Sequence, residues 1–135
     1  MKPLVLIFAL SLVFITQSNA QEKQEEHLLD GTSMNYYYQN GTAVHVDFDD
    51  GYFKYKWIAG PNKDAVGKVS YRSRKIGDKL YMVNFFEETN LTFVTIVFNF
   101  NQNVLHTSAL IAGGSDQRQI LFDGGIIENL TLIEN

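Results

Sequence analysis

The sequence predicts an all-β protein, built as an antiparallel up-and-down barrel of about eight strands. Apolar and polar residues alternate with a period of two, as in Met34-Asn35-Tyr36 and Val44-His45-Val46. Because successive side chains of a strand point to opposite faces, this alternation indicates half-buried strands. Turn-forming residues separate the runs at short, regular intervals, which is typical of consecutive hairpins.

Turn signals bound each expected strand in order along the chain. Asn40-Gly41 and Asp50-Gly51 are typical of two-residue hairpin turns, in which both central residues have a positive φ. Regular spacing favours closure into a barrel over an open sandwich, because closure removes the exposed strand edges. The expected strands are 32–39, 43–49, 52–58, 67–76, 79–87, 91–100, 103–111 and 118–123. The residues expected in the core are Val44, Val46, Phe48, Val94, Ile96 and Phe98.

The first twenty residues have the layout of a cleaved secretory signal peptide. Lys2 precedes an apolar run at 4–15, and Ser18-Asn19-Ala20 puts small residues at positions −3 and −1 of a cleavage point. The alternative, a membrane anchor, needs roughly 20 apolar residues, more than this run contains. We therefore expect an extracytoplasmic protein, periplasmic or secreted, with no stable membrane anchor after cleavage. The expected division is a signal at 1–20, a polar leader at 21–29 and one barrel domain at 30–135.

Composition excludes several classes of protein. The chain has 135 residues, 45% hydrophobic and 19% charged, which fits one globular domain. It has no cysteine, which excludes disulfides, cysteine-ligated metals and thiol catalysis. The net charge of −4 and the lack of a basic cluster argue against nucleic acid as a partner. The three histidines have no metal-ligand spacing, so we expect neither a metal nor a cofactor.

Three segments together carry a family resemblance. They read Gly-Thr-Ser-Met-Asn-Tyr-Tyr-Tyr-Gln-Asn-Gly at 31–41, Trp-Ile-Ala-Gly-Pro-Asn-Lys at 57–63 and Ile-Gly-Asp-Lys-Leu-Tyr-Met-Val-Asn-Phe-Phe-Glu at 76–87. In this order and spacing they resemble the MoaF-like domain of the calycin, or lipocalin-like, superfamily over residues 30–112. The resemblance implies a calycin-type β-barrel and leaves the reaction, if any, undefined.

The same pattern is more distantly similar to bacterial phenolic acid decarboxylases, which use two tyrosines, an arginine and a glutamate. That resemblance puts the tyrosines at Tyr36 and Tyr38 and the glutamate at Glu87. The arginine's place is nearest to Lys56. By alternation, Lys56 lies on the opposite strand face from Phe53, Tyr55 and Trp57. This departure counts against decarboxylase activity.

The candidate site lies in the barrel lumen. Tyr36 and Tyr38 share one strand face, about 7 Å apart, and could hydrogen-bond a ligand together. Glu87 follows three apolar residues on one face of its strand, where a shielded carboxyl group suits proton transfer. The competing interpretations are tyrosines that fill the core, a solvated glutamate at the rim and a tryptophan that plugs the barrel end. The expected ligand-binding residues are Tyr36, Tyr38, Trp57, Tyr81, Phe85 and Glu87.

Two functions from different classes fit these residues. The first is an exported barrel that binds a small apolar or aromatic molecule without catalysis. The second is a cofactor-free lyase acting on an aromatic acid, in which Glu87 is the catalytic candidate. A third interpretation is a filled barrel that serves as a structural or interaction module. Because an inward-facing cation is missing, the sequence favours binding. A cavity on which Tyr36, Tyr38 and Glu87 converge would distinguish the first two from the third.

Overall fold

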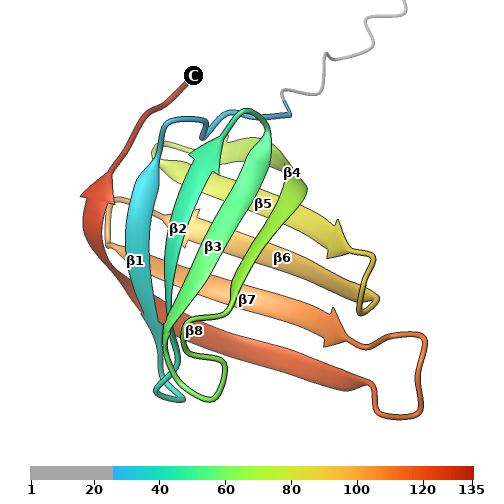
Figure 1. Cartoon of the computed structure of the whole chain (residues 1–135). Coiled ribbons are helices and arrows are strands. Elements are labelled where there is room, and N and C mark those ends of the chain that lie inside the picture. The colour runs from blue at the N-terminus through green and yellow to red at the C-terminus, as the bar shows by residue number, and fades with distance from the viewer. Residues whose placement is uncertain (1–25) are drawn as a thin grey trace, which may run out of the picture.

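Eight antiparallel strands close into one barrel, as the sequence predicts. The computed structural model describes residues 26–135, so the expected signal peptide lies outside the described residues. Each strand pairs with the next one in the chain, and β8 returns to pair with β1 (Figure 1). In residues 26–135, no helix has the length and apolar character needed to cross a membrane. The strands are β1 (Ser33–Tyr38), β2 (Ala43–Asp49), β3 (Tyr52–Ala59), β4 (Val66–Gly77), β5 (Leu80–Glu87), β6 (Thr92–Asn99), β7 (Val104–Ile111) and β8 (Gln119–Thr131).

The last strand is longer than the sequence indicates. We expected it to end at residue 123, just before Gly124 and Gly125. Instead β8 continues to Thr131, and Gly125 pairs with Tyr38 of β1. A Cβ atom on Gly125 would lie 2.6 Å from the Tyr37 carbonyl oxygen. The glycine therefore allows β8 and β1 to approach closely enough to close the barrel.

The two hairpin signals have different outcomes. Asp50 and Gly51 both have a positive φ, 51° and 76°, as the turn between β2 and β3 requires. Between β1 and β2 the prediction of a two-residue turn was wrong, because the connection spans residues 39–42. Of Asn40 and Gly41, only Gly41 has a positive φ. There the Asn40 Oδ1 atom accepts hydrogen bonds from the Thr42 amide at 2.9 Å and the Thr42 hydroxyl at 2.7 Å. The asparagine side chain thus takes over part of the turn's hydrogen bonding.

Segments from both ends of the described chain close one end of the barrel. Leu28 and Leu29 are buried in the core, although they stand at the end of the segment expected to be a polar leader. The Thr32 hydroxyl donates to the Ile133 carbonyl oxygen at 3.0 Å, and the Asn135 amide donates to the Leu28 carbonyl oxygen at 3.1 Å. Both segments lie at the same end of the barrel in Figure 1. The terminal segments therefore plug this end of the barrel.

Aromatic side chains form much of the core. Phe98 is fully buried and stacks on Phe100, with ring centroids 5.6 Å apart and planes 5° from parallel. Its ring also packs near those of Tyr36 and Phe48. Five of the six expected core residues are buried, and Val94, which lines a cavity, is half-buried.

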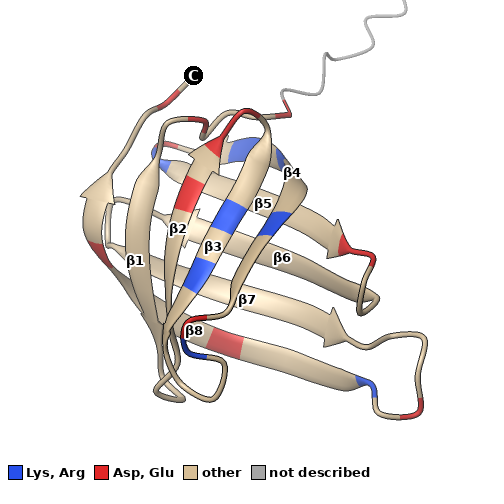
Figure 2. Ribbon diagram, in the orientation of Figure 1, with Lys and Arg blue, Asp and Glu red and all other residues tan. Residues whose placement is uncertain are grey.

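Charged residues concentrate in β2, β3 and β4 (Figure 2), and most of their side chains are exposed. Lys54 forms an ion pair with Asp49, and the Lys56 Nζ atom lies 4.0 Å from an Asp64 carboxylate oxygen. Lys56 is exposed, as expected from strand alternation. In contrast, β6 and β7 contain no Lys, Arg, Asp or Glu. The lysines of β3 therefore belong to the exterior and do not supply charge to the lumen.

Substitution of Phe98 tests the assignment of the core. Phe98→Ala should lower the free energy of unfolding by about 3–5 kcal/mol, because the ring is fully buried and leaves a cavity. Phe122→Ala is the matched control, since Phe122 is 87% exposed and its loss should cost under about 0.5 kcal/mol. Denaturant melts of both variants measure the difference, and equal losses would contradict the assigned inner and outer faces.

Candidate functional site

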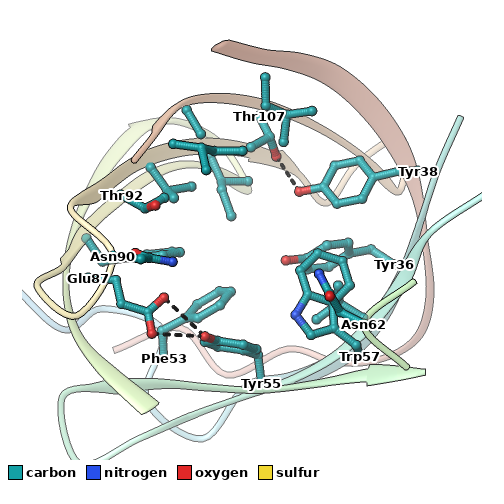
Figure 3. Close-up of a pocket in the computed structure, with 17 residues that line it drawn as sticks. Tyr36, Tyr38, Phe53, Tyr55, Trp57, Asn62, Glu87, Asn90, Thr92 and Thr107 are labelled. Atoms are coloured by element: carbon teal, nitrogen blue, oxygen red, sulfur yellow. Dashed lines mark hydrogen bonds between the residues drawn. The ribbon is translucent and has the colours of Figure 1, made fainter. Parts of the chain in front are cut away.

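A cavity of about 250 Å³ occupies the barrel at the end away from the terminal plug. Its walls come from the inward faces of β1 to β3 and β5 to β8, with Asn62 and Asn90 contributed by loops at the rim. Figure 3 shows the polar groups of these walls facing one another across the space. Because the terminal segments plug one end of the barrel, the cavity opens at the other end, between the loops.

Five of the six residues expected to bind ligand line this cavity, and Tyr81 does not. Tyr81 is buried near the other end, where it packs against Phe100 and its hydroxyl donates to the Glu134 carboxylate. It stands six residues before Glu87 in β5, which at about 3.3 Å per residue is roughly 20 Å along the strand. A shared strand face therefore does not bring the two side chains to the same site. The five lining residues are Tyr36, Tyr38, Trp57, Phe85 and Glu87.

Glu87 is held by a residue that the sequence did not single out. The Tyr55 hydroxyl of β3 lies 3.2 Å from each carboxylate oxygen of Glu87 (Figure 3). Burial, together with the nearby carboxylate, raises the pKa of Tyr55 to about 12. Tyr55 therefore remains a protonated donor, and it orients the Glu87 carboxylate inside the cavity. Strand alternation predicted that Tyr55 faces inward, but the pairing between β3 and β5 residues is not visible in the sequence.

The absence of a side chain at Gly67 leaves space for the Tyr55 ring. Gly67 of β4 pairs directly with Tyr55 across the strands. A Cβ atom at position 67 would lie 2.1 Å from Cζ and 2.2 Å from the hydroxyl oxygen of Tyr55. The ring therefore lies over the glycine, in space that every other residue type would fill.

Tyr36 and Tyr38 occupy the opposite side of the cavity from Glu87 (Figure 3). Their rings meet edge to face, with centroids 5.3 Å apart and planes at 79°. The Tyr38 hydroxyl is hydrogen-bonded to the Thr107 hydroxyl at 2.8 Å. Burial raises the pKa of Tyr36 well above its usual value and also raises that of Tyr38. Both tyrosines are therefore neutral groups that can donate or accept a hydrogen bond.

The walls are rich in aromatic rings and poor in charge. Glu87 is the one charged side chain among the residues that line the cavity, and none of those residues is Lys, Arg or His. Tyr36, Tyr38 and Glu87 thus converge on one space without the cation that the decarboxylase pattern requires. In the described part of the chain, no group of three or more His, Asp or Glu residues is placed to hold a metal ion.

The fold and the cavity define a small calycin-like barrel with a lumen open at one end. The family model described as MoaF-like matches residues 30–120, which is most of the chain. The chain therefore belongs to the MoaF-like family. No curated protein matches it significantly.

A solved structure shares this fold. It is the crystal structure of a protein from Burkholderia vietnamiensis named as a "putative beta-lactamase". The two chains are 18% identical, and the match covers 77% of this chain and 94% of the other with a TM-score of 0.65. At this identity the likeness extends to the barrel and not to an activity.

Gly67→Ala tests how Tyr55 is placed. The added methyl group would overlap the ring, so Tyr55 should rotate away and lose its hydrogen bond to Glu87. The substitution should lower the free energy of unfolding by about 1–3 kcal/mol. Gly124→Ala is the control, because its Cβ would meet nothing closer than 3.4 Å. Crystal structures and denaturant melts of both variants provide the comparison. An unmoved Tyr55 ring in Gly67→Ala would refute the close packing.

Alkaline pH tests the environment of the Tyr55 hydroxyl. Its pKa is about 12 in the folded protein and about 10 when unfolded, so its contribution to stability is complete below pH 10 and disappears as the pH rises through 12. Tyr55→Phe removes this titration. Between pH 10 and 12 the native protein should therefore lose more free energy of unfolding than Tyr55→Phe, as measured by urea melts. Parallel losses would mean that Tyr55 ionises as it does in water.

Proposed function

We propose that this protein is an exported barrel that binds a small apolar or aromatic molecule in its lumen and does not transform it. The observation that carries the proposal is the aromatic-walled cavity of about 250 Å³, open at the loop end. A cavity of roughly 150 Å³ is enough to hold benzene. The space therefore suits one aromatic ring with a short substituent, held by apolar contact and by the hydroxyls of Tyr36, Tyr38 and Tyr55.

Export is proposed from the sequence of residues 1–20. Their positive start, short apolar run and small residues before Gln21 are typical of a cleaved signal. A lumen-binding barrel outside the cytoplasm would act as a carrier or sensor of its ligand. N-terminal sequencing of exported protein should begin at Gln21.

A lyase acting on an aromatic acid is the second candidate. The convergence of Tyr36, Tyr38 and Glu87 on one cavity favours it, since these are the positions that the decarboxylase resemblance assigns. The lack of an inward cation opposes it, because Lys56 is exposed on the outer face of β3 and an aromatic carboxylate would meet only Glu87 as a charge. We therefore place binding first.

Blocking the lumen tests the binding function. p-Cresol should bind the native protein with one-to-one stoichiometry in isothermal titration calorimetry and change the fluorescence of Trp57, the single tryptophan. Ala109→Phe should abolish binding, because Ala109 is buried in the cavity wall and the larger ring fills the space. Ser108→Phe adds the same ring to the outer face of β7 and should leave binding unchanged. Equal binding by both variants would locate the site outside the lumen, and no binding by the native protein would support a filled barrel.

Turnover of 4-hydroxycinnamate distinguishes the second candidate. The binding function predicts no release of carbon dioxide above the uncatalysed rate when substrate and protein are incubated together. Rapid turnover that Glu87→Gln abolishes and Glu88→Gln preserves would establish the lyase instead. Glu88 is the appropriate control because it is exposed and does not line the cavity.

A further inference from the structure

We propose that the ligand of this cavity is a small organic cation, a primary amine on an aromatic or apolar body, with its ammonium group bound by Glu87. The proposal rests on the proposed function, since it names the chemical class of the molecule that the lumen holds. It adds a positive charge to the apolar or aromatic ligand that the sequence favours, because the arrangement of charge around the lumen is known only from the structure.

The only charge that lines the cavity is negative. Glu87 is the single charged residue among those that line it. Asp123 of β8 is half-buried and pairs with Thr107 of the cavity wall, and its negative charge helps to raise the pKa of Tyr38. No Lys, Arg or His belongs to the lining residues. An anionic ligand would therefore meet repulsion without a compensating partner, while a cation would be attracted.

Glu87 has hydrogen-bonding capacity left for a ligand. The hydroxyl of Tyr55 has one hydrogen, and it lies equally far, 3.2 Å, from both carboxylate oxygens. An ionised carboxylate can accept about four hydrogen bonds, so both oxygens keep free lone pairs. An ammonium group has three hydrogens to donate, and hydrogen bonds between two charged groups are stronger than those between neutral ones.

Aromatic rings complete the surroundings that such a cation prefers. Tyr36 and Trp57 stand across the cavity from Glu87, and Tyr55 and Phe53 lie beside it (Figure 3). The faces of aromatic rings carry partial negative charge and attract ammonium groups, most strongly where water is excluded. A carboxylate surrounded by rings therefore binds the charged end of the ligand, while the remaining rings contact its body.

Three ligands of nearly equal size test the proposal on the native protein. Titration calorimetry at pH 7 compares 2-phenylethylamine, 2-phenylethanol and phenylacetate, which carry a positive, a neutral and a negative group on the same ring. The amine should bind at least about tenfold more tightly than the alcohol, and phenylacetate should bind most weakly. This comparison needs no variant, so a folding defect cannot obscure it.

Two matched variants assign the preference to one carboxylate. Glu87→Gln should reduce the advantage of the amine over the alcohol to about twofold or less, while Glu88→Gln should keep it, because Glu88 does not line the cavity. Alcohol binding that equals amine binding in the native protein would overturn the cation proposal and leave lumen binding intact. Tightest binding by phenylacetate would overturn it as well. If p-cresol also fails to bind, the proposed function falls with it.

Discussion

The site depends on one constraint, which is that the inward-facing side chains of a closed barrel must share the lumen. In a closed sheet each strand sends alternate side chains into the lumen, and those side chains must fill it or surround a cavity. At the plugged end the lumen is filled by rings such as Phe98 and Phe100. Toward the loop end the inward positions of β3 and β5 hold Tyr55 and Glu87, which bond to each other rather than fill the centre. A cavity remains where the polar pair replaces core packing.

Much of the fold could be predicted because alternation is a local property. Seven of the expected strands lie within a few residues of the observed ones, and the faces of Val44 and Phe98 are as expected. The exception is β8, which was expected to end at residue 123 and continues through Gly124 and Gly125 to Thr131. Whether two glycines end a strand or let it approach a neighbour depends on the partner, and here the partner is Tyr37 of β1. That contact joins opposite ends of the domain and is invisible locally.

The sequence predicts which strand face each site residue occupies, but not its position along the barrel axis. Alternation assigns Tyr81 and Glu87 to one face of β5, yet one lies near the plugged end and the other in the cavity. The position along the barrel depends on where strands start relative to the plug, which the sequence pattern does not reveal. The partnership of Tyr55 with Glu87 likewise requires the register of β3, β4 and β5, including the space left by Gly67.

The central claim is that the lumen is a ligand site. A crystal structure of the protein grown with p-cresol tests it most directly. The account predicts one cresol ring inside the barrel, between Tyr36, Tyr55 and Trp57, with its hydroxyl within hydrogen-bonding distance of a lumen hydroxyl or of Glu87. A lumen closed by its own side chains, with cresol bound only on the outer surface, would contradict it.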